Sequence, residues 1–392
     1  MRRKWIFIVI VIFLLVAGGA ISYYFYKKTS PALKEKPPGR VSSTSLKKTI
    51  ITPHMEQSII KDQNIVYCST FQLAWNELKD GIVKEDIKMT DEPPMVKILN
   101  KGLSTKSDLS EKDYVAMAGF GKDNIVEKIN KELTKKFKNE ATPVESIPPD
   151  GLMIYSFLYK NLEFKKEFES IVGAFPFFYS NGQTSKVGAF GINYCGTPEC
   201  IKSHEKYVKQ VDVLYYPSDD ELYGDITQKH PNVNLMSADL TEFIDFVIRL
   251  NEKAGEDEII LAKIKPEDTL QKTVEAVNEL IKNRKPEALS TIDVLNIPKF
   301  LFDIEHTFGP LLGKLLQNKG VTGFPIARAT QTIMFKLDEK GAMVKSTSNM
   351  VAAAIPKQLI FDRPFLIYLK EKNAKWPYFA MWVANSELMQ EP

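Results

Sequence analysis

Apolar residues recur along the chain with two periods, which separate predicted helices from predicted strands. Spacings of three and four residues put apolar side chains on one face of a helix, and they occur in Phe71–Leu78, Asn124–Lys138, Leu240–Asn251 and Thr269–Lys282. Short apolar or alternating runs bounded by turn residues are typical of strands, and they occur in Gly151–Tyr159, Val187–Ile192, Val211–Tyr216, Glu258–Ile264, Thr291–Ile297, Thr330–Leu337, Pro364–Leu369 and Tyr378–Val383. Helices and strands do not alternate regularly, so the pattern predicts an α+β fold.

The N-terminus has a different pattern. After the basic segment Met1–Lys4, the 22 residues from Trp5 to Tyr26 carry no charge, end in aromatic residues and are followed by lysines. About 20 apolar residues cross a bilayer as a helix, and aromatic residues gather at its interfaces. We therefore expect a transmembrane signal anchor over residues 5–26, with residues 1–4 in the cytosol. A signal peptide cleaved near Gly18-Gly19-Ala20 is the alternative, and it would give a secreted protein.

The segment after the anchor predicts a tether rather than a folded unit. Residues 27–49 are rich in Pro, Lys, Ser and Gly and lack apolar periodicity, which is typical of a flexible stalk. No second low-complexity linker and no internal repeat follow. We expect residues 50–392 to form one monomeric domain outside the cell, held at its surface.

The composition is that of an ordinary globular protein and excludes some function classes. Hydrophobic residues make up 44% and charged residues 26% of the 392 residues, and 52 Lys and Arg face 49 Asp and Glu, for a net charge of +3. That balance creates no strongly basic field to hold phosphates, so we expect no nucleic-acid partner. Three cysteines are too few for a disulfide scaffold.

Established catalytic and cofactor motifs are missing from the sequence. It has no Gly-x-Ser-x-Gly, no His-Glu-x-x-His, no P-loop, and no Gly-x-Gly-x-x-Gly ahead of a helix. We therefore expect no cofactor and no enzymatic activity.

The cysteines leave one chemical question open. Cys195 and Cys200 flank a Gly/Pro turn near His204, but zinc would need a fourth ligand, so a disulfide is the favoured interpretation and no metal is expected. Cys68 lies among apolar residues and is interpreted as a buried thiol. A membrane-tethered enzyme that uses Cys68 or the Cys195–Cys200 region is the least favoured alternative.

Three segments of the C-terminal third follow a known order. Glu339-Lys340-Gly341 is similar to a Glu-x-Gly hinge, Phe361–Phe365 to a Phe-x-x-Pro-Phe return, and Ala380–Asn385 to a Met-Gly-x-Val-x-Asn-Pro ending in which Trp382 replaces Gly and Ser386 replaces Pro. In this order and at these spacings, the segments resemble the serpins.

Upstream segments resemble the same family, with departures. Asn64–Ser69 is similar to the entry into its first core helix, although Thr70 and Gln72 depart from the motif. Leu152–Phe168, Leu261–Ile281 and Ile297–Phe300 are similar to later strands and turns, but the tryptophan expected near Phe164 is missing. The resemblance spans roughly residues 60–386, and Lys79–Pro149 is shorter than its counterpart.

The resemblance implies both a fold and a mechanism. The fold is a central mixed or antiparallel sheet with helices packed around it and an exposed reactive-centre-like loop. In the family, a protease cleaves the loop, which then inserts as a new strand and distorts the bound protease. The hinge residues would be Glu339, Gly341, Ala342 and Val344. Because side chains alternate along a strand, Ala342 and Val344 would face inward and Lys345 outward, which avoids a buried charge.

The family's spacing also implies where the loop is cut. Counting from Glu339 places the scissile bond near Ile355-Pro356, where the proline is unfavourable for most serine proteases. Ala354-Ile355 and Lys357-Gln358 are the neighbouring candidates. The hypothesis is a cell-surface inhibitor of a serine or cysteine protease. The alternative is a tethered serpin-fold binding or structural module without trapping, motivated by the atypical hinge and the short distal loop.

Overall fold

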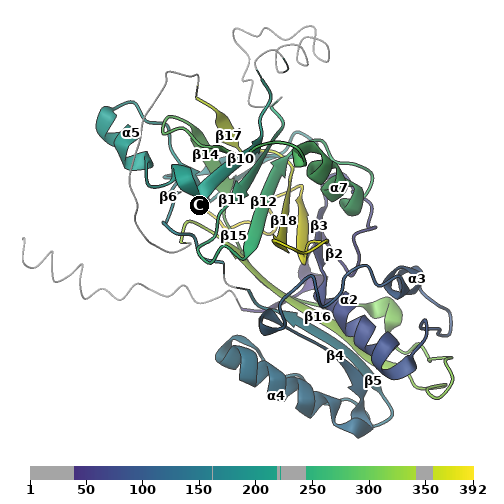
Figure 1. The fold of residues 1–392 in the computed structure, drawn as a ribbon. Helices are drawn as coiled ribbons and strands as arrows, with labels where there is room; N and C mark the ends of the chain where they lie inside the picture. The colour runs from purple at the N-terminus through teal and green to yellow at the C-terminus, as the bar shows by residue number, and fades with distance from the viewer. Residues whose placement is uncertain (1–38, 161, 219–220, 222–243, 341–355) are drawn as a thin grey trace, which may run out of the picture. The chain divides into compact units, whose positions relative to one another are not determined.

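The computed structural model describes residues 39–160, 162–218, 221, 244–340 and 356–392 of the chain (Figure 1). The chain divides into two units, Met1–Pro38 and Gly39–Pro392, and the described residues all belong to the second. The predicted transmembrane segment, residues 5–26, lies outside the described residues. Among the helices that are described, none is long and apolar enough to cross a membrane.

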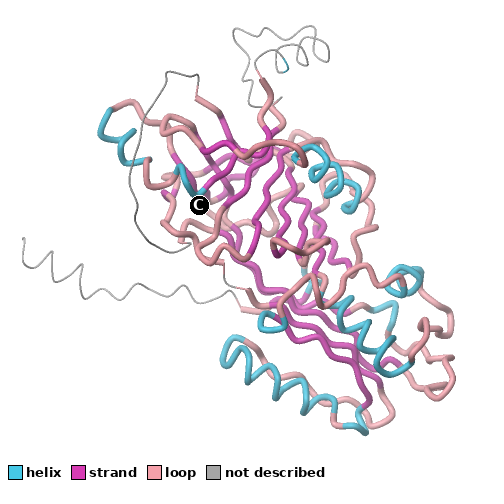
Figure 2. The backbone as a smooth tube through the Cα atoms, in the orientation of Figure 1, coloured by secondary structure: helices cyan, strands magenta, loops and turns pink. Residues whose placement is uncertain are grey.

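Four β-sheets form the framework of the described part of the second unit (Figure 2). A five-stranded sheet has the order β1 (Val41–Ser42), β15 (Phe300–Thr307), β16 (Ile326–Leu337), β5 (Leu152–Leu158) and β4 (Tyr114–Phe120). An eight-stranded sheet has the order β13 (Glu287–Ala288), β10 (Val211–Tyr215), β11 (Phe246–Leu250), β12 (Asp257–Lys263), β18 (Phe365–Glu371), β19 (Phe379–Val383), β3 (Asn64–Cys68) and β2 (Thr49–Thr52).

Two smaller sheets and several helices complete the described part. A four-stranded sheet has the order β17 (Gln358–Ile360), β14 (Val294–Pro298), β9 (Ala189–Ile192) and β6 (Glu169–Ser170), and a separate hairpin pairs β7 (Phe175–Phe178) with β8 (Thr184–Val187). The helices are α2 (Thr70–Asn76), which continues into the π-helical turn η2 (Glu77–Val83), α3 (Pro94–Asn100), α4 (Ile125–Phe137), α5 (Pro198–His204) and α7 (Leu270–Ile281). The combination of helices with sheets that are mostly antiparallel but contain some parallel pairs confirms the predicted α+β class.

The apolar periods explain how the helices pack on the sheets. In α4, the buried residues Ile125, Ile129, Leu133 and Phe137 follow each other at four-residue spacing and face the five-stranded sheet. The other face of that sheet packs against α2, so β5 is buried on both sides. A third cluster of buried apolar residues joins the five-stranded, eight-stranded and four-stranded sheets. These layers fix the positions of both ends of β16.

One predicted helix is wrong in its described part. Residues 246–250 of the predicted helix Leu240–Asn251 form strand β11, which lies between β10 and β12 in the eight-stranded sheet. Four of its five residues are buried because both faces of the sheet are covered. A short continuous apolar run of this kind fits a buried helix and a buried strand equally well, so periodicity could not separate them.

The folded unit begins before residue 50. The composition predicts a stalk that includes residues 39–49, yet β1 pairs in parallel with β15, with Val41 opposite Ile304. The Arg40 guanidinium lies 3.1 Å from the Asp303 carboxylate. The second unit therefore begins at Gly39. A two-residue edge strand such as β1 has no periodicity that the sequence could reveal.

Candidate functional site

The candidate site is the end of β16, where the chain leaves the five-stranded sheet. β16 pairs antiparallel with β15 from Thr330 to Leu337, but its parallel pairing with β5 stops at Ile333, opposite Leu158. Residues 334–337 therefore have a neighbouring strand on one side only. Glu339, the predicted hinge residue, follows two residues after Leu337. Gly341, Ala342, Val344, Ala354 and Ile355, which the sequence also assigned to the site, lie outside the described residues.

Glu339 is held in place by contacts from the four-stranded sheet. Its carboxylate lies 2.7 Å from the Nζ atom of Lys299, and both side chains are largely buried. Lys299 also donates from Nζ to the Ser170 hydroxyl at 2.9 Å. The Phe168 amide donates to the Glu339 carbonyl oxygen at 3.0 Å. The backbone of Glu339 is thus anchored next to β6, and its side chain is anchored to Lys299, which lies between β14 and β15 and itself contacts Ser170 of β6.

The ion pair also controls the charge state of the hinge. Burial alone would raise the pKa of the Glu339 carboxyl, but the hydrogen bond and the charge of Lys299 outweigh it, and the pKa lies below its ordinary value of 4.5. Glu339 is therefore ionised at neutral pH, and the contact with Lys299 is charge-assisted.

Replacing Glu339 by Gln is expected to destabilise the protein by about 1 kcal/mol at pH 7. Because the carboxyl has a lowered pKa in the folded state, its stabilisation is present above the unfolded pKa near 4.5 and is lost as the pH falls through the folded value. The difference in free energy of unfolding between wild type and Glu339→Gln should shrink below pH 4.5, which denaturant unfolding at pH 3 to 7 would measure. A difference that grows in acid would contradict this assignment.

A buried charge cluster fixes the adjacent end of β5. Lys160, two residues beyond β5, lies with Nζ 2.7 Å from Asp257, 3.1 Å from Glu371 and 3.2 Å from Asp113. Its ammonium also sits 4.7 Å from the ring centre of Tyr378. Asp113 precedes β4, while Asp257 and Glu371 belong to β12 and β18. The cluster therefore fastens the ends of β4 and β5 to the eight-stranded sheet.

A cavity of about 120 Å³ lies between the charge cluster and the hinge. Apolar side chains from β16 and the eight-stranded sheet line it, together with the charged residues of the neighbouring turns; they include Lys160, Phe164, Phe335, Leu337, Asp338 and Lys340. The cavity borders the stretch of β16 that lacks a second neighbour. The cavity thus lies where the chain leaves the sheet.

The described residues on the distal side of the loop are already paired. The Lys357 amide donates to Asp293 Oδ1 at 2.8 Å, and the Lys357 ammonium lies 3.2 Å from Glu287. Gln358 lies opposite Val294 as the first residue of β17, and Pro356 precedes this anchored stretch. Cleavage at Lys357-Gln358 would need this pairing to open, which favours the candidate bonds further upstream.

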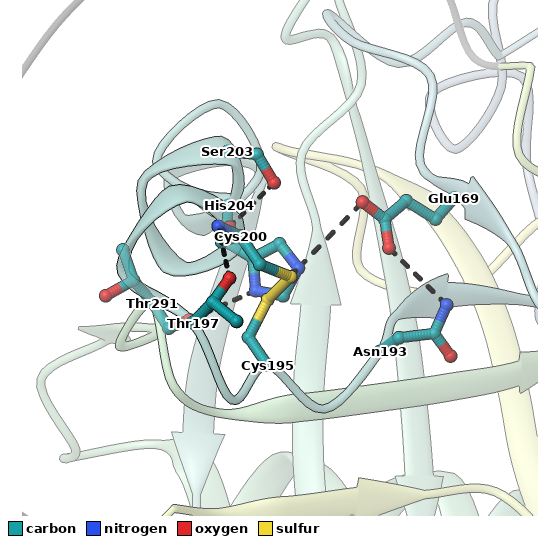
Figure 3. The surroundings of a disulfide bond; sticks show 8 residues. All are labelled: Glu169, Asn193, Cys195, Thr197, Cys200, Ser203, His204 and Thr291. Carbon is teal, nitrogen blue, oxygen red and sulfur yellow. Dashed lines mark hydrogen bonds and ion pairs between the residues drawn. A yellow bond between two sulfur atoms is a disulfide. The ribbon is translucent and has the colours of Figure 1, made fainter.

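The cysteines occupy two different settings. Cys68 is fully buried, and burial raises the pKa of its thiol to about 11, so it is a thiol rather than a nucleophilic thiolate at neutral pH. Its carbonyl oxygen accepts a hydrogen bond from Gln331 of β16. Cys195 and Cys200 form a disulfide beside His204 (Figure 3).

Sequence reasoning found Glu339 but not its partners. Lys299 and Ser170 lie far from it in the sequence and appeared only inside strand-like or loop segments. The Lys160 cluster joins four separate parts of the chain and has no local signature at all. The only usable signal was the resemblance that covers Lys299 within Ile297–Phe300.

The comparisons with known proteins find a distant structural likeness. No protein-family model and no curated protein matches the chain. Solved structures that are similar to it include thyroxine-binding globulin in complex with thyroxine (13% identity, TM-score 0.47) and human glycosylated kallistatin (13%, 0.46), each matched over 82% of this chain and 92% of that chain. The mouse protein-Z dependent protease inhibitor is 13% identical, with a TM-score of 0.49, over 82% of this chain and 91% of its own. These proteins are serpins, the family that the C-terminal motifs resemble.

Proposed function

We propose that this chain is a divergent serpin-type protease inhibitor, tethered by residues 5–26 at the cell surface as a monomer, with residues 341–355 as bait. Its partner would be a protease with a serine or cysteine nucleophile. The nucleophile attacks the carbonyl carbon of the residue before the scissile bond, the amine of the next residue leaves with a proton, and an acyl-enzyme remains attached to the N-terminal part of the loop.

The observation that carries the proposal is the parallel pairing of β5 with β16. A loop that reverses direction after Glu339 and enters between these strands would run antiparallel to both of them. One parallel contact would then be replaced by two antiparallel ones, which are slightly more stable per residue. Alternate side chains of the new strand would also be buried. Insertion of the loop therefore lowers the free energy of the protein once cleavage has detached the loop from β17.

The geometry at the end of β16 also supports insertion of the loop between β5 and β16. The four residues of β16 beyond Ile333 lack a neighbour on the β5 side, and the cavity lies beside them. A new strand can begin to pair there before β5 and β16 have to separate. The small side chain of Ala342 and the uncharged side chain of Val344 are suited to the first inward-facing positions.

A binding or structural module without trapping is the second candidate. The Lys160 cluster favours it, because this cluster fastens β5 to the eight-stranded sheet and so opposes separation of β5 from β16. Met343, Val344 and Lys345 also replace the small residues that the family usually has at this point of the loop.

Trapping is tested by incubating the full chain, in detergent, with a serine protease that accepts small residues before the scissile bond, for which Ala354-Ile355 is the candidate substrate. The expected result is a covalent adduct that survives SDS denaturation, together with loss of protease activity. Complete cleavage of the chain with the protease left fully active would favour the non-inhibitory module.

A matched pair of loop variants separates trapping from simple cleavage. Val344→Asp places a charge at an inward-facing position of the inserted strand, whereas Thr347→Asp places the same charge at an outward-facing one. Val344→Asp should be cleaved without forming the adduct, and Thr347→Asp should trap like wild type. Equal trapping by both variants would contradict strand insertion.

A further inference from the structure

Four potential ligand residues converge at one edge of the four-stranded sheet (Figure 3). The disulfide of Cys195 and Cys200 lies against the ring of His204, with Cys195 Sγ 3.3 Å from His204 Nε2. Glu169, on the edge strand β6, points its Oε1 atom at the same ring nitrogen from 3.8 Å. Cys195 and His204 are buried, whereas Cys200 is partly exposed.

The hydrogen bonds of His204 show which ring nitrogen is available. Nδ1 lies 3.1 Å from the backbone carbonyl oxygen of Thr291, which can only accept, so Nδ1 carries the hydrogen. In the neutral ring, Nε2 then presents its lone pair to the sulfur of Cys195 and the carboxylate of Glu169. Both of these groups are also electron-pair donors. A cation bound between His204 Nε2, the Cys195 sulfur and the Glu169 carboxylate would accept an electron pair from each of the three groups.

We propose that Cys195, Cys200, His204 and Glu169 bind a zinc ion when the disulfide is reduced. Thiolate, imidazole and carboxylate are the protein ligands of zinc, and Glu169 supplies the fourth ligand that the sequence alone did not reveal. The ligand atoms of Cys195, Cys200 and His204 all lie within 4.8 Å of one another. In a tetrahedral site with ordinary zinc–ligand bonds they would be about 3.5–3.8 Å apart. Glu169 lies outside this group of mutually close atoms, so its side chain has to rotate toward the sulfur atoms to complete the site.

The surroundings of the four residues already resemble the outer shell of a metal site. The Thr291 carbonyl orients the His204 ring through Nδ1, and the Asn193 side-chain amide donates to Glu169 Oε2 at 3.4 Å, which leaves Oε1 directed at the ring. Hydrogen bonds of this kind fix the tautomer and the orientation of a ligand side chain before the metal binds. The burial of His204 and Cys195 further limits competition from water.

Reduction of the disulfide and binding of zinc are two separate steps, and each is balanced in atoms and electrons. The thiolate of a dithiol attacks Cys200 Sγ, the more accessible sulfur, and Cys195 leaves as a thiolate next to His204. The second thiol of the reductant then releases Cys200 and closes a cyclic disulfide, so two electrons and two protons reach the protein. Zinc displaces the two thiol protons when it binds, and its oxidation state does not change.

The test uses the full chain in its oxidised form and after reduction with a dithiol, which is removed before zinc chloride is added. Roughly one zinc ion per reduced chain and none per oxidised chain is the expected result of elemental analysis after dialysis. Cobalt in place of zinc should give a thiolate charge-transfer band, which reports the sulfur ligands directly in wild-type protein. A reduced chain that binds no zinc, or cobalt without that band, would overturn the proposal.

Variants assign the individual ligands. Glu169→Gln should weaken zinc binding at least about tenfold, and Cys195→Ser should abolish it. Cys68→Ala is the matched control, because it removes the remaining cysteine, which belongs to β3 and is not among the grouped ligand residues, and it should not affect binding. Far-ultraviolet circular dichroism verifies that each variant is folded. Zinc binding that is equal in wild type, Glu169→Gln and Cys195→Ser would show a different site.

Discussion

Cleavage of the loop within residues 341–355 is expected to raise the thermal unfolding midpoint of the protein by at least about 10 °C. The native form pairs β5 directly with β16, and a freed loop can replace this single parallel contact by two antiparallel ones. At an unfolding entropy of about 2.1 cal/mol/K per residue, such a rise corresponds to roughly 7 kcal/mol for a unit of the size of Gly39–Pro392. That gain is within reach of several new backbone hydrogen bonds of about 1 kcal/mol each.

The measurement compares intact and nicked protein by calorimetry or circular dichroism after limited digestion with a nonspecific protease. Mass spectrometry locates the cut, since only cuts within residues 341–355 are informative. Nicked Val344→Asp should melt like its intact form, whereas nicked Thr347→Asp should show the full rise. If nicked wild type melts at or below the intact protein, the loop does not insert, and the binding-module alternative becomes the working hypothesis.

The sequence was most informative where side-chain periodicity is long and one-sided. The helix at Asn124–Lys138 is found as α4 because its buried residues repeat every four positions against a single sheet face. Every predicted strand with described residues is found too, for example Thr330–Leu337 within β16. Periodicity failed at β11, where burial on both faces removes the alternation that would mark a strand.

The candidate site was only half visible in the sequence. Glu339 could be named because it belongs to a short motif. Its partner Lys299 lies far away in the sequence and is recognised only from the folded structure. The same holds for Glu169, which approaches His204 only because β6 pairs with β9. Contacts of this kind arise from sheet register between distant segments, and neither composition nor local pattern encodes them.

Replacing Lys160 by Met is expected to lower the free energy of unfolding by about 3–5 kcal/mol at pH 7. The side chain of Lys160 is 8% exposed and is the shared partner of Asp113, Asp257 and Glu371. Without the ammonium, these carboxylates would be left close together and poorly solvated, which is the costly outcome for a buried ion pair. Chemical denaturation monitored by tryptophan fluorescence gives the free energy directly.

The loss of stability in Lys160→Met should depend on pH, and the direction of this dependence identifies the ionised carboxylates as its cause. Burial raises the pKa of Asp257 above its ordinary 3.8, and the hydrogen bond and charge of Lys160 offset part of that rise, so Lys160→Met should raise it further. A carboxyl with a raised folded pKa destabilises when ionised, and the penalty disappears as the pH falls through that value. The gap between Lys160→Met and wild type should therefore narrow as the pH is lowered from 7 toward 4.

Lys112→Met is the matched control for this experiment. The ammonium of Lys112 lies 2.8 Å from Glu256, but both side chains are well exposed, so water screens the pair and replaces the lost contact. Lys112→Met should unfold like wild type at every pH. If Lys160→Met behaves in the same way, the cluster does not fasten β5 to the eight-stranded sheet. The main structural obstacle to opening β5 from β16 would then be gone, and loop insertion would become easier to reconcile with this fold.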